Sequence, residues 1–169
     1  MSKWKKQDRY AFVLVAVCAY VVSIFLAWWN VTMIGDSESP AVAMRIDGMG
    51  AGYGSNRLSE FCVVIAVAIL VLTGMTLRSS DSRLLLALRH LAIALMIFNA
   101  LAVLELWRMM KSMFSAPSFY RGSEIAYGAP VAIGMSILVL WAVLVLEAGG
   151  VRKLLNRRRE DATEPPPSS

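Results

Sequence analysis

The sequence has little that could bind a metal or support catalysis. His90 is its only histidine, and Cys18 and Cys62 are its only cysteines. A single histidine excludes a bis-histidine haem, a three-histidine zinc site and an H-E-x-x-H metal site within this chain. The sequence also lacks a G-x-S-x-G nucleophile elbow and a phosphate-binding loop closed by Lys-Ser/Thr. We therefore expect a protein that is not an enzyme and that needs no cofactor.

Charged residues are also scarce. They make up 17% of the 169 residues, whereas an average soluble domain has about 25%, and hydrophobic residues make up 57%. The hydrophobic residues lie in four long blocks. Because a hydrocarbon core about 30 Å thick requires about 20 residues of helix, blocks of this length predict an integral membrane protein with no separate soluble domain.

Four transmembrane helices are predicted, in an all-α bundle. In lipid every backbone N–H and C=O must be paired within the protein, which a helix achieves in a single segment. The turn Arg78–Arg83 is so short that the second and third helices must be antiparallel neighbours, and Ser80 or Asp81 is expected to cap the third helix. The predicted spans are residues 11–30, 60–77, 84–108 and 128–147.

The rest of the chain is predicted to form connections and a tail. Residues 1–150 make the four-helix transmembrane domain, in which the polar ranges 34–58 and 111–127 connect helices. Residues 151–169 are a cytoplasmic tail, first basic and then Pro-rich. Its last ten residues, EDATEPPPSS, should be disordered because they have nothing to bury.

Lysine and arginine residues near the helix ends predict the orientation, because cytoplasmic loops carry an excess of both. One side of the predicted membrane has twelve, namely Lys3, Lys5, Lys6, Arg9, Arg78, Arg83, Arg89, Arg152, Lys153, Arg157, Arg158 and Arg159. The other side has five, namely Arg45, Arg57, Arg108, Lys111 and Arg121. This bias predicts an up-down bundle in a bacterial inner membrane with both termini in the cytoplasm. It also accounts for the net charge of +5 without nucleic-acid binding.

The two thiols are expected to be buried and unpaired. With the predicted spans, Cys18 and Cys62 differ in depth by more than about 10 Å, too far for a disulfide, which needs Cα atoms within about 7 Å. Six of the ten methionines lie near the outer boundary, where thioethers could bind Cu(I). Because these methionines have no regular spacing, flexible packing is the interpretation that we favour.

Polar residues in the third predicted helix are candidate functional residues, because a charge deep in a bilayer costs about 2.5–3.5 kcal/mol on insertion scales. Arg89 and His90 lie one to two turns from the inner boundary. Either could pair with Glu147 on the fourth helix, or Arg89 could instead extend to the membrane surface. Asn99, near the middle of the membrane, is expected to form a hydrogen bond with another helix.

Two further groups lie near the predicted outer boundary. Glu105 and Arg108 are three residues apart on one helix face, which favours a local ion pair, with a cation or proton site at Glu105 as the alternative. Gly128, Ala132 and Ser136 are spaced by four, forming a stripe that lets another helix approach closely. That helix could belong to the same bundle or to a second subunit.

These features favour a non-enzymatic accessory or structural subunit that acts through helix packing and its outer loops. The alternative is an oligomeric transporter, channel or holin-like pore component, which Glu105, Asn99 and the small-residue stripe would favour. The expected partners are the lipid bilayer and either another membrane subunit or a second copy of the chain.

Overall fold

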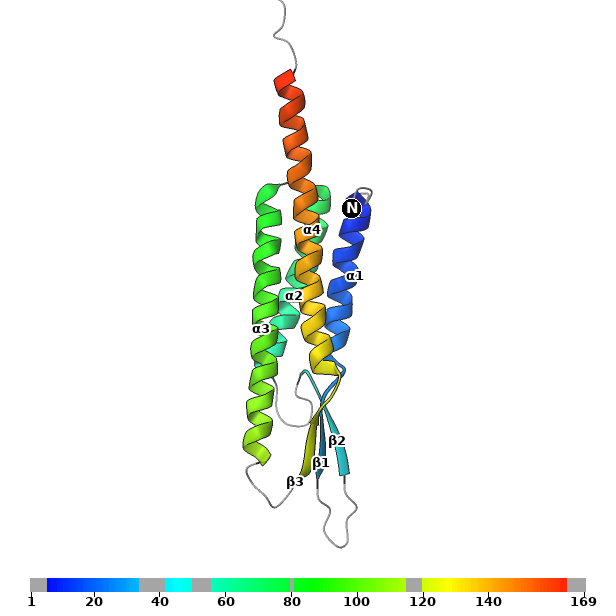
Figure 1. Ribbon diagram of the computed structural model, residues 1–169, viewed down its shortest axis with the longest axis vertical. Helices are drawn as coiled ribbons and strands as arrows, with labels where there is room; N and C mark the ends of the chain where they lie inside the picture. The colour runs from blue at the N-terminus through cyan, green and yellow to red at the C-terminus, as the bar shows by residue number, and fades with distance from the viewer. Residues whose placement is uncertain (1–5, 34–41, 50–55, 80, 115–119, 164–169) are drawn as a thin grey trace, which may run out of the picture.

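Four helices form most of the protein, whose computed structural model describes residues 6–33, 42–49, 56–79, 81–114 and 120–163. Each helix contains a stretch long and apolar enough to cross a membrane, which confirms the prediction of four candidate spans. Figure 1 shows them side by side, with the α2–α3 turn and the start of α1 at one end, here called the turn end. Their bounds are α1 (Lys6–Ile24), α2 (Arg57–Arg78), α3 (Ser82–Phe114) and α4 (Gly128–Thr163).

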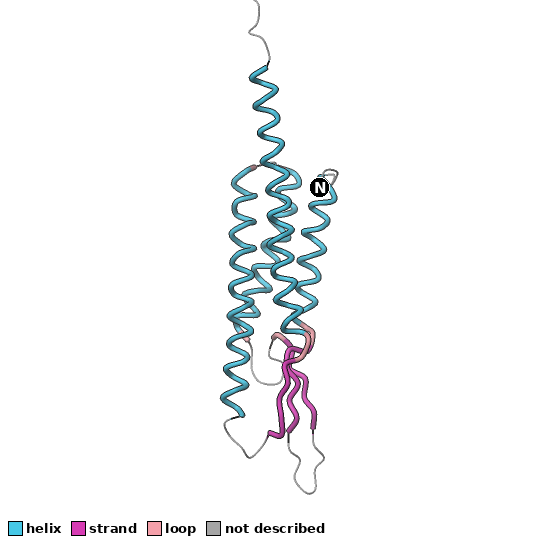
Figure 2. The backbone as a smooth tube through the Cα atoms, in the orientation of Figure 1, coloured by secondary structure: helices cyan, strands magenta, loops and turns pink. Residues whose placement is uncertain are grey.

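A small antiparallel sheet lies at the opposite end of the helices, here called the sheet end (Figure 2). Its strands are β1 (Ala27–Met33), β2 (Val42–Asp47) and β3 (Tyr120–Ile125), in the order β2-β1-β3. The all-α prediction missed this sheet. The prediction of a first helix over residues 11–30 is wrong in its last residues, because α1 ends at Ile24. The aromatic and β-branched residues that follow favour a strand, and the two connections supply strands that pair with it.

The end of α1 is joined to the sheet by backbone and side-chain hydrogen bonds. The Ser23 carbonyl accepts from Leu26 N at 3.3 Å and from the indole Nε1 of Trp28 at 3.0 Å. The Ile24 carbonyl accepts from Gly48 N at 2.8 Å, next to the end of β2. The last carbonyl groups of a helix normally lack partners, and here the first residues of the sheet supply them.

Side-chain caps define the starts of α2 and α3. Asn56 caps α2, accepting from Ser59 N at 3.4 Å, and its amide Nδ2 donates to the Ala102 carbonyl of α3 at 3.4 Å. Asp81 accepts from Arg83 N at 2.9 Å, as the sequence predicted for the start of α3, whereas Ser80 lies outside the described residues. Because Ala102 is level with the start of α2, the rest of α3 extends past α2 beside the sheet (Figure 1).

The fourth helix is much longer than predicted. It continues through Gly149 and Gly150 to Thr163 and projects beyond the other helices at the turn end (Figure 1). Residues 160–163 of the tail belong to this helix, and residues 164–169 lie outside the described part of the chain. The segment RKLLNRRR consists mostly of good helix formers, so the helix continues once it has begun.

The packed interior excludes solvent, while the outer helix faces remain apolar. Trp28, Tyr20, Ile69, Leu95 and Val139 are fully buried. Many large hydrophobic side chains are exposed on the helices, and they include Val15, Phe25, Val64, Val71, Ile97 and Ile137. Helices that are apolar on every side suit a lipid environment.

A matched pair of glycines on α4 tests the joint between sheet and helices. A methyl group at Gly128 would collide with the Ala27 carbonyl and the Trp28 ring, whereas one at Gly134 would meet nothing within 4 Å. We expect Gly128→Ala to destabilise the protein by about 1–3 kcal/mol, as overpacking does. Gly134→Ala should leave stability unchanged or raise it. Thermal unfolding in detergent measures both, and equal midpoints would contradict the close contact.

Candidate functional site

A hydrogen-bonded network connects three helices in the interior. The Tyr20 hydroxyl on α1 donates to Asn99 Oδ1 on α3 at 3.2 Å. Asn99 Nδ2 in turn donates to the Ser136 hydroxyl on α4 at 3.4 Å, and that hydroxyl donates to the Ile133 carbonyl at 2.8 Å. Asn99 therefore bonds across to other helices, as its position in the sequence indicated. All three side chains of this network are at most 1% exposed.

Cys62 extends this network towards α2, since its thiol lies next to the Tyr20 hydroxyl. Cys18 lies two residues before Tyr20 on α1. Both thiols are free, and Cys62 is buried as expected, whereas Cys18 is exposed.

The network connects α1, α3 and α4 through neutral hydrogen bonds. An amide does not ionise, and both ends of the Asn99 side chain have partners. Within the described ranges, no three His, Cys, Asp or Glu side chains gather as a metal site would require. Tyr20, Asn99 and Ser136 thus satisfy one another, which is the arrangement that low-dielectric surroundings favour.

A second polar contact lies nearer the turn end. Arg89 Nη1 on α3 lies 3.2 Å from Glu147 Oε1 on α4, with the side chains 37% and 21% exposed. The sequence suggested that Arg89 or His90 pairs with Glu147, and the structure brings Arg89 and Glu147 together. The third, His90, is exposed, and its Nδ1 lies 2.7 Å from the Leu86 carbonyl one turn back on the same helix.

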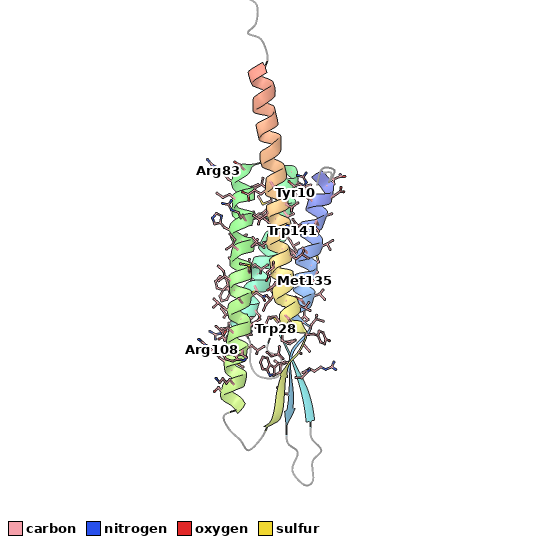
Figure 3. All side chains as sticks on the ribbon, in the orientation of Figure 1. Tyr10, Trp28, Arg83, Arg108, Met135 and Trp141 are labelled. Carbon is pink, nitrogen blue, oxygen red and sulfur yellow. The ribbon has the colours of Figure 1, made fainter. Side chains whose placement is uncertain are left out.

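Glu105 and Arg108 are exposed side chains near the sheet end of α3. In the part of the chain that the structure describes, they form no ion pair with each other. Both follow Ala102, which is level with the start of α2, so they lie towards the end of the membrane-spanning part. Figure 3 shows Arg108 pointing away from the other helices, at about the level of Trp28.

The small-residue stripe is used within the chain itself. Gly128 contacts Ala27 and Trp28, while Ala132 and Ser136 have no exposed surface. Ser136 also accepts the hydrogen bond from Asn99. The contacts of this stripe are thus made by the same chain, with β1 at Gly128 and α3 at Ser136.

An apolar cleft that the sequence did not indicate lies where α3 and α4 meet the sheet. Its volume is about 270 Å³. The indole N–H of Trp29 is buried and has no hydrogen-bond partner among the described residues. Trp28, Trp29 and Trp107 lie near one predicted membrane boundary, and this clustering was the available sign of the cleft in the sequence. The sequence did not predict the strand β1, which places Trp28 and Trp29 beside α3. The lining residues are Trp28, Trp29, Ala100, Val103, Leu104, Leu106, Trp107, Ile125 and Ala129.

Conservative substitutions test the interior network. Tyr20→Phe and Ser136→Ala each remove one partner of Asn99, and each should lower the free energy of unfolding by about 0.6–1.7 kcal/mol, the range for interhelical hydrogen bonds in membranes. In an Asn99→Leu background the Tyr20→Phe effect should disappear or reverse. Tyr127→Phe, at an exposed tyrosine, serves as the control. An unchanged effect of Tyr20→Phe in that background would show that the two side chains are not coupled.

Charge exchange tests the contact between α3 and α4. Arg89→Glu and Glu147→Arg each place like charges together and should each lower stability by about 1–2 kcal/mol, between the values for exposed and buried pairs. The double exchange restores the attraction and should recover at least half of that loss. Unfolding in detergent measures all three variants. A double variant no more stable than either single variant would mean that the pair contributes nothing.

Comparison with known proteins identifies no family for this chain. No family model matches it, and no curated protein matches it significantly. Its role therefore has to be inferred from the chemistry of the interior contacts, the cleft and the sheet.

Proposed function

We propose that this chain is a non-enzymatic membrane subunit that holds a small β-sheet at the outer face of a bacterial inner membrane, where the sheet contacts a partner protein. The observation that carries the proposal is the firm attachment of the sheet to the helices. Gly48 N bonds to the Ile24 carbonyl, Ala126 N bonds to the Trp28 carbonyl at 2.9 Å, and the Trp28 indole bonds to Ser23. A sheet held in this way presents a fixed surface.

The filled interior supports a structural role rather than conduction by a single chain. The side chains between the helices are fully buried, and the polar groups at their centre bond to one another. Moving an ion through this region would require breaking both the packing and the network. The helices therefore serve better as a support than as a pathway.

The charge distribution supports an orientation with both termini in the cytoplasm. The start of α1, the α2–α3 turn and the projecting part of α4 lie together at the turn end (Figure 1). This end carries the larger share of the lysine and arginine residues, as cytoplasmic segments do. The connectivity is up-down, and the sheet end then faces outwards.

The sheet itself offers a surface for a protein partner. In the order β2-β1-β3, and among the residues that the structure describes, the strands β2 and β3 each pair on one side only. An unpaired strand edge can accept a strand from another chain. Arg45 on β2 is exposed, as are Ile125 and Tyr127 at 61% and 63%. This mixture of exposed charge and exposed apolar surface is typical of a contact region.

An oligomeric transporter, channel or holin-like pore remains the alternative. Two features that favoured it, Asn99 and the small-residue stripe, make contacts within one chain. Glu105 is the third sequence feature behind this alternative. Its side chain is exposed and accessible to a second copy of the chain.

Cross-linking with a membrane-impermeant thiol-to-amine reagent in spheroplasts tests both partner and orientation. Single cysteines are placed at Arg45 on the sheet and at Arg83 at the turn end, with Cys18 and Cys62 changed to alanine. Both arginines are exposed, so the two substitutions are matched. Arg45→Cys should cross-link to a different polypeptide, whereas Arg83→Cys should react only after permeabilisation.

Each other outcome contradicts a specific part of the proposal. Reaction of Arg83→Cys alone in intact spheroplasts would reverse the orientation. Adducts of Arg45→Cys with identical chains only would favour the oligomeric pore. Labelling of Arg45→Cys without any adduct would contradict a partner at the sheet.

A further inference from the structure

The two edges of the sheet differ in what lies beside them. The edge strand β3 is next to the part of α3 that extends past α2, because Ile125 lines the same cleft as Leu104 and Trp107. The strand β2 forms the opposite edge, on the side away from α3 (Figure 1). Among the residues that the structure describes, β2 therefore has the more accessible edge. Alternate residues of such a strand direct their N–H and C=O groups outwards, where another strand can bond to them.

The direction of β2 restricts which strand can pair with this edge. The strands lie along the direction of the helices, and β1 continues from α1 away from them (Figure 1). Both β2 and β3 are antiparallel to β1, so both run back towards the helices. A strand that continues the antiparallel pattern at β2 must therefore run away from the helices.

A second copy of the chain does not supply such a strand from the part that the structure describes. Copies in one membrane share an orientation, because the lysine and arginine residues that determine it are the same in each. The edge strands β2 and β3 of a second copy would then also run towards the helices. Its β1 runs outwards but is already paired on both sides. An outward-running strand at this edge therefore comes from a different polypeptide.

The exposed face of β2 carries a positive charge that has no matching charge across the sheet. Arg45 is exposed, and Asn30, the residue directly opposite on β1, is exposed and neutral. Within the described ranges, Arg45 forms no ion pair. Opposite charges at facing positions of two antiparallel strands stabilise the pair, whereas like charges destabilise it. An acidic residue opposite Arg45 therefore suits the added strand.

We propose that β2 pairs with an extended segment of a different membrane protein, which runs outwards from the membrane and places an aspartate or glutamate opposite Arg45. The stretch that directly follows an outward-crossing transmembrane helix has this direction, as β1 does after α1. The inference rests on the proposed function, in which the sheet contacts a partner. It adds the edge, the direction and the charge of the partner segment.

Photo-cross-linking of the full-length chain in cells tests the edge and the direction. The photoreactive residue p-benzoylphenylalanine replaces Ala43 or Asp47, two residues before and after Arg45 in β2, or Ile125 at the other edge. Both β2 positions should give adducts with one different polypeptide, and Ile125 should give fewer. Asp47 is nearer the helices than Ala43. Its attachment site should therefore precede that of Ala43 in the sequence of the partner.

Charge substitutions test the acidic residue, with the adduct from the probe at Ala43 as the readout. Arg45→Glu should lower the yield roughly 2- to 10-fold, because it turns an attractive cross-strand pair into a repulsive one. Arg45→Lys keeps the charge and should retain most of the yield. The matched control is Arg57→Glu, at an exposed arginine in the first turn of α2 and outside the sheet, which should leave the yield unchanged.

The other outcomes separate this inference from the proposed function. Adducts with a different polypeptide from Ile125 alone, or attachment sites in the reverse order, would overturn the inference and leave the proposed function standing. Equal yields with Arg45→Glu and Arg57→Glu would do the same. Adducts between identical chains at the β2 positions would overturn the inference in favour of self-pairing. No adduct with another polypeptide from any of the three positions would contradict the proposed function as well.

Discussion

The structure depends on how the chain leaves the membrane at the end of α1. Inside the hydrocarbon core a helix pairs its own backbone groups, but its last carbonyls need other donors. Here the donors are the Trp28 indole and the Gly48 backbone N–H, which bond to Ser23 and Ile24. One of these donors lies in β1 and the other follows β2. The hydrogen bonds that end the helix therefore also position the sheet. The same bonds bring Trp28 and Trp29 to the cleft.

The interior is organised around a few polar contacts separated by apolar layers. Lipid offers little hydrophobic driving force for helix association, so close packing and hydrogen bonds between helices decide which faces meet. Asn99 has one partner on α1 and one on α4. It therefore specifies the rotation of three helices at once, and the pair Arg89–Glu147 adds a second constraint on α3 and α4 nearer the turn end. Two contacts at different depths define the relative orientation of these two helices better than either alone.

Patterns along the sequence predicted the helices well and the sheet not at all. Hydrophobic length reveals a span because the membrane imposes that length, and Asn99 and Glu147 could be identified because polar residues are costly there. The strands are six or seven residues long and pair residues distant in the chain, such as Asn30 with both Arg45 and Glu124. No local pattern contains that information. The error at residues 25–30 had the same origin, since hydrophobic residues at a membrane boundary suit either a helix or a buried strand.

The direct connection between β3 and α4 joins distant parts of the molecule mechanically. Only Ala126 and Tyr127 separate the strand from a continuous helix of 36 residues, about 54 Å long at 1.5 Å per residue. A push or twist applied to β3 would therefore travel along one stiff rod to Thr163. The exception is Gly149 and Gly150, where the absence of side chains makes the rod easiest to bend. Whether force arriving from the sheet is transmitted or absorbed is thus decided by two residues at the turn end.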